Sequence, residues 1–288
     1  MTRSVAGLIA MALLMPQPKA LSDLHAQARA ESKGVQVGYC TSLKNLAAAK
    51  SAGFDYVELN TTEIANLTDA EFESAVADTA RIGLPTPASN SFVPATIRLT
   101  GPAIDRDQQA AYVTKAFDRV SKLGVRIVVF GSGGARRVPD GFSRDEAFRQ
   151  LVDFGRRAAQ LARPRGITIA VEPLRREETN IINSAADGLE LVNAISDPNF
   201  QLMVDFYHLA SEHEDPGIIV LARAHLRHLH MANPDGRVFP QSRGEFAYEP
   251  FFAALRSIGY GQRISVEAST KDLKTEAPRA IALLRGMF

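Results

Sequence analysis

The chain has little cysteine, little net charge and few long apolar stretches. Its single cysteine, Cys40, excludes an internal disulfide and a zinc site built from several cysteines. The 33 lysines and arginines nearly balance 32 acidic residues, so the net charge is +1. Domains that bind nucleic acid are usually clearly basic, and we therefore predict no nucleic-acid partner. A length of 288 residues, 45% of them hydrophobic, suits one soluble domain with a single core plus an extension.

The N-terminus carries the features of an export signal. Arg3 precedes the apolar run Val5–Met15, and small residues follow at Ala26 and Ala28. This order is typical of a secretory signal peptide, and the run is too short to span a membrane as a mature helix. We predict that residues 1–30 are a signal peptide or else an N-terminal extension packed on the domain. A signal implies a periplasmic or secreted protein without a membrane segment in its mature form, whereas an extension implies a cytoplasmic one.

After residue 34, short apolar runs alternate with longer helical stretches. The predicted strands are Val35–Tyr39, Tyr56–Leu59, Thr86–Asn90, Arg126–Phe130, Ile167–Val171, Leu202–Asp205, Leu226–His230 and Ile264–Glu267. The predicted helices are Lys44–Ala52, Asp69–Ile82, Gln108–Leu123, Asp145–Ala162, Ala186–Ile195, Pro216–Ala224, Tyr248–Ile258 and Thr275–Leu284. Strands that alternate with helices predict parallel pairing. Eight such units favour an α/β fold with a single-domain (β/α)8 TIM barrel over residues 35–288.

An open, doubly wound sheet is the alternative fold. Such a sheet usually has a glycine-rich turn after its first strand, and here the corresponding segment, Cys40–Ser42, has no glycine. Glycines do follow the fourth predicted strand, at Gly131–Gly134. A glycine cluster of this kind fits a phosphate-binding loop or a tight turn over the barrel mouth equally well, so the closed barrel is the favoured prediction.

Metal-binding residue types end four successive predicted strands. They are Glu172, Asp205, His230 and Glu267. The carboxyl ends of barrel strands meet at one face, where such enzymes place catalytic groups. Three carboxylates there would repel one another, and a divalent cation removes that cost. Any one of them could be a helix cap or a surface ion pair, but four at equivalent positions predict a metal site. The set favours Mn²⁺, with Mg²⁺, Co²⁺ or Zn²⁺ as alternatives.

The motifs around these residues resemble the sugar-phosphate isomerase/epimerase superfamily, the xylose isomerase-like TIM barrels. The resemblance is carried by Glu172-Pro-Leu, Asp205-Phe-Tyr-His208, His228-Leu-His230 and Ser265-Val-Glu267. Ketose 3-epimerases of the D-tagatose 3-epimerase type offer the best comparison. The resemblance covers about residue 35 to the end of the chain and does not specify one substrate.

What the resemblance implies is a set of roles. One metal would be held by Glu172, Asp205, His230 and Glu267. Glu172 and Glu267 would also serve as acid and base on opposite faces of a sugar. The substrate would be contacted by His208, Glu178 and Arg237. Association into a homo-oligomer is an expectation by analogy alone.

The chemistry of these groups agrees with such roles. A hydrogen next to a carbonyl is weakly acidic, and a divalent cation stabilises the enediolate that forms when a carboxylate removes it. Return of the proton on the opposite face inverts the carbon. The sequence therefore predicts a metal-dependent isomerase or epimerase that acts on a keto-sugar or related polyol, a small-molecule substrate.

Some features depart from the epimerase pattern and keep other functions open. Family epimerases often have Asn where Arg175 stands, and Arg237 lies one position further from His230 than expected. An export signal is also unusual for enzymes of cytosolic sugar metabolism. A lyase that cleaves 3-keto-glycosides would share the first proton abstraction. An endonuclease IV-like phosphodiesterase, which would need more histidines, and a non-catalytic sugar-binding barrel are the remaining alternatives.

Two further segments have an open role. His228 alternates with His230 and shares its face of the strand at a deeper position, so a structural role is predicted. The third predicted strand runs into the segment Ser89–Pro94, which offers small polar groups and one aromatic ring to a sugar, although a plain loop explains it nearly as well.

Overall fold

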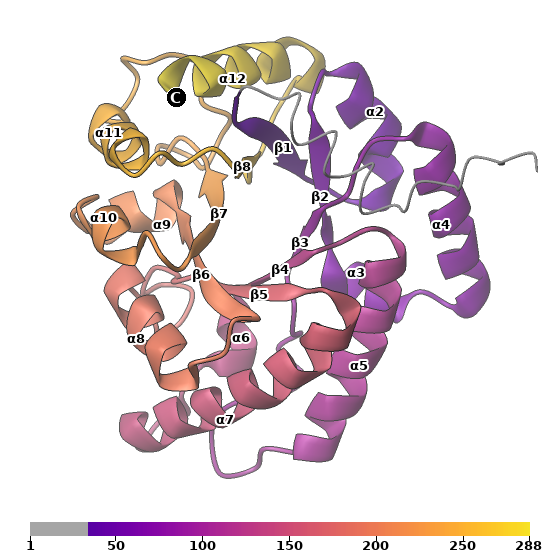
Figure 1. Ribbon diagram of the computed structural model, residues 1–288, viewed down its shortest axis with the longest axis vertical. Helices are drawn as coiled ribbons and strands as arrows, with labels where there is room; N and C mark the ends of the chain where they lie inside the picture. Colours follow the sequence, from indigo (N-terminus) through magenta and orange to yellow (C-terminus); the bar gives the residue numbers. More distant parts are fainter. Residues whose placement is uncertain (1–33) are drawn as a thin grey trace, which may run out of the picture. The chain divides into compact units, whose positions relative to one another are not determined.

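Eight parallel strands form a closed barrel. The computed structural model describes residues 34–288. Each strand pairs with its neighbour in sequence, and the first strand closes the ring against the last. The strands are β1 (Gln36–Cys40), β2 (Tyr56–Asn60), β3 (Ala88–Asn90), β4 (Ile127–Phe130), β5 (Thr168–Val171), β6 (Phe200–Asp205), β7 (Leu226–Met231) and β8 (Arg263–Val266). This arrangement (Figure 1) confirms the predicted TIM barrel and excludes the open sheet.

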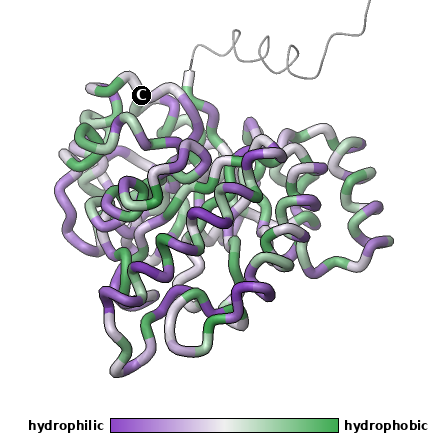
Figure 2. Tube along the Cα trace, turned by 60° about the horizontal axis from the view of Figure 1, so that its bottom comes forward, coloured by the Kyte–Doolittle hydropathy of each residue, from purple (hydrophilic) through white to green (hydrophobic). Residues whose placement is uncertain are grey.

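Helices surround the strands and connect them (Figure 1). The main ones are α2 (Leu46–Ser51), α4 (Asp69–Ile82), α5 (Arg106–Lys122), α7 (Arg144–Ala162), α8 (Ala185–Ile195), α10 (Ile218–Ala222), α11 (Glu249–Ser257) and α12 (Leu273–Met287). Figure 2 shows hydrophobic residues along the central strands and alternating hydropathy along the outer helices. This pattern is typical of amphipathic helices that cover a sheet buried on both faces. No helix between residues 34 and 288 has the length and apolar character to cross a bilayer.

Local sequence signals explain why several helices begin and end where predicted. In α4, Thr68 and Glu71 form a reciprocal capping box at the start, and Gly83 ends the helix with φ 67°. Both devices satisfy backbone groups that a helix end leaves without partners. The side chains of Ser143 and Ser184 cap α7 and α8, each accepting a hydrogen bond from the backbone N–H of the third residue after it.

Other boundaries differ from the prediction. The third strand begins at Ala88 instead of Thr86, because Pro87 has no N–H to donate to a neighbouring strand. The predicted helix over residues 44–52 divides into a 3-10 turn, η1 (Leu43–Asn45), followed by α2. A second 3-10 turn, η2 (Arg163–Arg165), extends α7. The predicted signal or extension at residues 1–30 lies outside the described residues.

Three short helices were not predicted. They are α3 (Thr61–Asn66), α6 (Gly133–Arg136) and α9 (Phe206–Ser211). Each follows the carboxyl end of a strand and is too short to show helical periodicity in the sequence. The glycine cluster after β4 therefore enters a single helical turn at the barrel mouth.

The inside of the barrel has an apolar half and a polar half. Successive side chains of a strand point to opposite faces. Strands β3 to β6 place inside the barrel a small apolar cluster of Ala88, Ile127, Val129, Ala170 and Met203. Strands β2, β7 and β8 instead contribute buried polar side chains: Tyr56, Glu58, His228, His230 and Ser265. The candidate site rests on this polar half.

A glycine in β1 makes room for the polar half. Gly38 pairs with Tyr56 of β2, and a Cβ at position 38 would lie 2.2 Å from the Tyr56 ring. The Tyr56 ring is fully enclosed and its hydroxyl lies 2.8 Å from Ser265 Oγ, so it has no free direction in which to move.

Gly38→Ala should therefore destabilise the protein. Overpacking of a buried site costs about 1–3 kcal/mol, which urea denaturation can measure as a lower midpoint at unchanged slope. Gly244→Ala is a matched control, because a Cβ there would meet no atom within 4 Å. Equal unfolding midpoints for the two variants would contradict this account of Gly38.

Candidate metal centre and active site

Four side chains converge at the carboxyl ends of β5 to β8. Glu172 and Glu267 directly follow β5 and β8, while Asp205 ends β6 and His230 lies in β7. Each offers one donor atom, and these atoms all lie within 4.8 Å of one another. The structure thus brings together the four residues that the sequence selected, although their role as ligands stays a prediction.

The donor set fits a divalent cation. Asp205 Oδ2 is buried and has no hydrogen-bond partner. Burial, followed by repulsion from Glu267, raises the pKa of both Asp205 and Glu172 above its usual range. A cation that prefers carboxylate and imidazole donors would partner the free oxygen and remove the repulsion.

His230 faces two different groups through its two ring nitrogens. Its Nδ1 lies 3.2 Å from Glu172 Oε1 and 3.4 Å from Glu267 Oε2. Its Nε2 lies 2.9 Å from Oε1 of Glu58. Cys40 Sγ also approaches Nε2, at 3.8 Å. The Nδ1 side therefore belongs to the carboxylate cluster, and the Nε2 side points into the barrel.

The group of Cys40, Glu58 and His230 could in principle hold a metal as well. Burial, then the charge of Glu58, raises the pKa of the Cys40 thiol well above its usual range, which disfavours the thiolate that binds metals. Glu58 already accepts three hydrogen bonds. Both candidate groups within residues 34–288 contain His230, and we assign a single centre on its Nδ1 side.

Glu58 was not selected from the sequence. It lies in β2, is fully buried, and has His228 as a second partner at 2.7 Å. Burial by itself opposes ionisation, but the contacts with His230 and His228 outweigh it and lower the pKa of Glu58 well below its usual range. An acidic residue inside an apolar strand was the available signal, because charged side chains are almost never fully buried without a partner.

Glu267 is held at both carboxylate oxygens. Asn90 donates its side-chain N–H to Oε1 at 2.9 Å, and Arg237 Nη2 donates to Oε2 at 2.6 Å. Burial opposes ionisation of Glu267, but His230 and Arg237 outweigh it and lower its pKa. Glu267 is therefore an ionised carboxylate with a fixed orientation. Asn90 is the last residue of β3 and belongs to the segment Ser89–Pro94, whose contact with substrate the sequence left open.

Arg237 contacts two carboxylates at the mouth of the barrel, those of Glu267 and Glu178. Besides Glu267, its guanidinium contacts Glu178 Oε1 at 3.3 Å. Its backbone has φ 50°, a left-handed conformation that is uncommon for arginine. The backbone N–H and hydroxyl of Ser269 both donate to the Arg237 carbonyl, at 2.9 and 3.2 Å, and hold this conformation. Arg237 and Glu178, both expected near the substrate, are thus in direct contact.

Tyr207 supports two guanidinium groups. Those of Arg237 and Arg175 lie 4.5 and 5.0 Å from the centre of its ring, within the range of a cation–π interaction. Arg175 Nε also donates to Glu178 Oε1 at 3.1 Å. Arg175 occupies the position where family epimerases often have Asn, so its longer charged side chain adds a second cation at the mouth.

His208 presents an unpartnered donor. The backbone N–H of Arg175 donates to its Nδ1 at 3.3 Å, which leaves the proton on Nε2. Nε2 is buried, has no hydrogen-bond partner, and lies 3.7 Å from Asp205 Oδ2. Burial, followed by the charge of Arg237, lowers the pKa of His208 to about 3. His208 is therefore a neutral imidazole that can donate one hydrogen bond beside the carboxylate cluster.

Two residues of the β4 loop make space for Glu172 and hold its backbone. A Cβ on Gly131 would lie 2.4 Å from Glu172 Oε2. Arg136 is fully buried and donates to the carbonyl of Glu172 at 2.8 Å and to that of Phe130 at 3.0 Å. The segment after β4 thus anchors the turn after β5.

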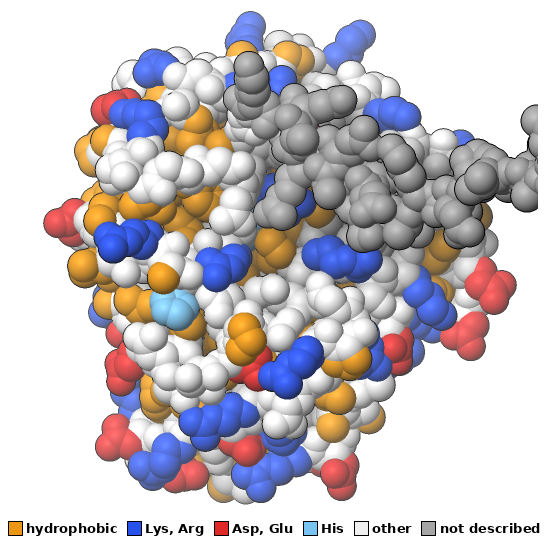
Figure 3. Space-filling model, viewed as in Figure 1, with side chains coloured by type: hydrophobic (Ala, Val, Ile, Leu, Met, Phe, Trp, Pro, Cys, Tyr) orange, Lys and Arg blue, Asp and Glu red, His pale blue; other side chains and the backbone are white. Residues whose placement is uncertain are grey.

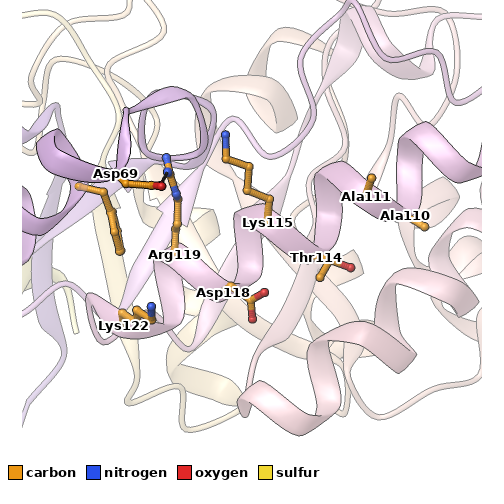
Figure 4. Close-up of a pocket in the computed structure, with 9 residues that line it drawn as sticks. Asp69, Ala110, Ala111, Thr114, Lys115, Asp118, Arg119 and Lys122 are labelled. Carbon is orange, nitrogen blue, oxygen red and sulfur yellow. Dashed lines mark hydrogen bonds and ion pairs between the residues drawn. The ribbon is translucent and has the colours of Figure 1, made fainter.

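A surface groove lies away from these residues. It has a volume of about 560 Å³ and is lined by parts of α4 and α5 (Figure 4). Arg119, one of its basic residues, is already paired with Asp69 at 2.7 Å. On the face seen in Figure 3, Lys and Arg side chains lie in small groups between acidic, apolar and uncharged ones. The absence of a nucleic-acid partner stays a prediction.

Sequence comparison places the chain among known proteins. The family described as xylose isomerase-like TIM barrel matches residues 46–287. The chain belongs to this family. An L-ribulose 3-epimerase of Methylomonas sp. is 27% identical over 236 residues, which cover 80% of this chain and 79% of that protein. A D-psicose 3-epimerase of Agrobacterium fabrum is 25% identical over 234 residues, 76% of each chain. These relatives confirm that the chain is an enzyme of the isomerase and epimerase class.

The fold is shared with solved structures of this kind. A D-allulose 3-epimerase from Methylomonas sp. superposes with a TM-score of 0.78 at 23% identity, covering 89% of this chain and 99% of that one. At this level of identity the similarity supports the TIM barrel and says nothing of substrate.

Addition of Mn²⁺ to metal-stripped protein should raise the melting temperature. A ligand at 100 times its Kd stabilises the folded state by about 2.7 kcal/mol. Asp205→Asn should lose most of this increase, because the amide lacks the anionic oxygen, while its remaining oxygen can still accept from Tyr207 N–H as Oδ1 does. The measurement is differential scanning fluorimetry with EDTA as reference. An equal Mn²⁺ response in wild type and Asp205→Asn would remove Asp205 from the ligand set.

Proposed function

We propose that this protein is a divalent-metal-dependent epimerase or isomerase of keto-sugars. The observation that carries the proposal is the convergence of Glu172, Asp205, His230 and Glu267 within 4.8 Å at the carboxyl end of the barrel. Active sites of TIM barrel enzymes lie at this end. The relatives named as ketose 3-epimerases support a keto-sugar as the substrate class.

The four converging residues would hold the cation. When bound there, it would supply Lewis-acid stabilisation of negative charge on substrate oxygens. Mn²⁺ is our first choice, because three carboxylates and one imidazole form a mainly hard donor set. The remaining steps depend on the side chains of the protein.

Glu267 is the proposed base. It is ionised, and Asn90 and Arg237 fix its two oxygens, so its orientation is set before substrate arrives. A carboxylate in this state removes a proton next to a carbonyl if it lies within hydrogen-bond reach. Glu172, across the cluster and with a raised pKa, is the proposed acid that returns a proton on the other face.

His208, Glu178 and Arg237 are the proposed substrate contacts. The neutral His208 offers an N–H to a sugar oxygen. Glu178 can accept from a sugar hydroxyl, and Arg237 connects this carboxylate to the base. These three side chains together would hold the reacting carbon next to Glu267. Such positioning lowers the activation barrier of the proton transfer.

Glu267→Gln should abolish exchange of the reacting hydrogen with solvent. General base catalysis contributes about 10²–10⁴-fold, so a rate loss of at least about 100-fold is expected. The assay follows carbon-bound hydrogen by NMR in D₂O, with Mn²⁺ at saturation and a panel of ketoses and 3-keto-glycosides as substrates. Glu190→Gln, on the exposed face of α8, is the control that should exchange at the wild-type rate.

The product of the same experiment separates the competing functions. An inverted carbon supports the epimerase, and a released aglycone supports the 3-keto-glycoside lyase that shares the first step. Metal binding without exchange by the wild-type protein would favour a sugar-binding barrel. Exchange that survives in Glu267→Gln would show that another group is the base.

A further inference from the structure

Glu58 is a buried carboxylate that the proposed mechanism does not use. From β2 it reaches side chains of β7 and β8 inside the barrel. Its Oε1 lies 2.9 Å from His230 Nε2. Its Oε2 lies 2.7 Å from both His228 Nε2 and Ser265 Oγ. All four side chains are fully buried, so water does not compete for these contacts.

The direction of each hydrogen bond follows from the chemistry of the groups. An ionised carboxylate accepts and cannot donate. Both imidazoles and the Ser265 hydroxyl must therefore donate to Glu58. Tyr56 Oη lies 2.8 Å from Ser265 Oγ and donates to it, because the serine proton is already committed. Every proton in this network points toward Glu58.

This arrangement determines which nitrogen of His230 remains free. The proton on Nε2 is held by Glu58 at 2.9 Å, whereas the contacts of Nδ1 with Glu172 and Glu267 are longer, at 3.2 and 3.4 Å. A neutral imidazole has one protonated nitrogen and one lone pair. A divalent cation in the carboxylate cluster would displace the proton from the nitrogen that faces it. With the other proton retained at Nε2, the lone pair of Nδ1 would then point at that cation.

We propose that Glu58 is a positioning residue that fixes the Nε2–H tautomer of His230 and thereby makes Nδ1 a metal ligand. The inference rests on the proposed function, in which His230 holds the cation. Carboxylates that accept from a metal-bound histidine raise its basicity and fix its ring orientation, and their loss typically weakens metal binding 10–100-fold. Here the carboxylate comes from a strand 172 residues away in sequence.

His228 supports the same geometry from the side. Its ring lies edge-on to that of His230, with centres 5.3 Å apart and planes at 83°. It shares Glu58 with His230 and is held by Oε2. The small residues Gly38 and Ser265, on β1 and β8 between β2 and β7, leave space for Glu58 to reach both rings.

The first test measures Mn²⁺ affinity by titration calorimetry on EDTA-stripped full-length protein. Glu58→Met removes both acceptor oxygens at similar volume and should raise the Mn²⁺ Kd about 10–100-fold. Glu58→Gln, which keeps one acceptor oxygen, should lie between this variant and wild type. Ser265→Ala is the matched control: it removes a donor to Oε2 but leaves the contact of Oε1 with His230, so its Kd should stay within about threefold of wild type.

The outcomes separate this inference from the proposed function. Wild-type protein that binds no Mn²⁺ would overturn the proposed metal centre and with it this role for Glu58. Wild-type binding with an unchanged Kd in Glu58→Met would overturn the role of Glu58 alone. A loss in Ser265→Ala as large as in Glu58→Met would also overturn it, because a general disturbance of the buried network would then explain both.

A second measurement needs no substitution at position 58. Long-range ¹H–¹⁵N NMR on protein with ¹⁵N-labelled histidine and saturating Mg²⁺ reports the tautomer of each ring, and the signal missing in His230→Gln identifies His230. We expect a proton on Nε2 and none on Nδ1. A proton on Nδ1 of His230 would overturn the inference, whether or not the Glu58 variants fold.

Discussion

Negative charge buried at the carboxyl end of the barrel is the constraint on which the site depends. Glu172, Asp205 and Glu267 meet there, with Glu58 beneath them. An unpaired charge in such a position costs several kcal/mol, so each carboxylate needs a cation or a set of donors. Arg237 and Asn90 supply them for Glu267, and two histidines supply them for Glu58. Asp205 Oδ2 has no hydrogen-bond partner and lies 3.8 Å from Arg237 Nη2, and a divalent ion would complete the balance.

The barrel brings these charges and donors together because the side chains of each strand alternate between its inside and its outside. Residues two apart point the same way, so His228 and His230 both face inward, as do Tyr56 and Glu58. Strands β3 to β6 form the apolar half of the interior. In the polar half, the low dielectric strengthens the hydrogen bonds and would make an unpaired polar group costly. The charged cluster at the mouth therefore lies directly above a layer of hydrogen-bonded polar side chains.

Much of the fold and the site could be predicted because it depends on local patterns. Apolar runs of strand length separated by helical stretches predict the (β/α)8 barrel. The placement of Glu172 and Glu267 at strand ends can be read from a few neighbouring residues. The short helix α6 and the exact start of β3 were harder to predict. Helix α6 is a single turn, and β3 begins only after Pro87, which has no N–H to pair with a neighbouring strand.

The sequence by itself determined the order of strands and the positions of Glu172, Asp205, His230 and Glu267 at their ends, because period and strand length are properties of neighbouring residues. Only the tertiary structure decided which groups hold these side chains. Glu58 reaches His230 across 172 residues, and Asn90 reaches Glu267 across 177. Such contacts arise when the barrel closes β1 onto β8. Which residues make these contacts depends on where small inward side chains, such as Gly38, leave space for longer ones to reach across the barrel. No local sequence pattern contains that information.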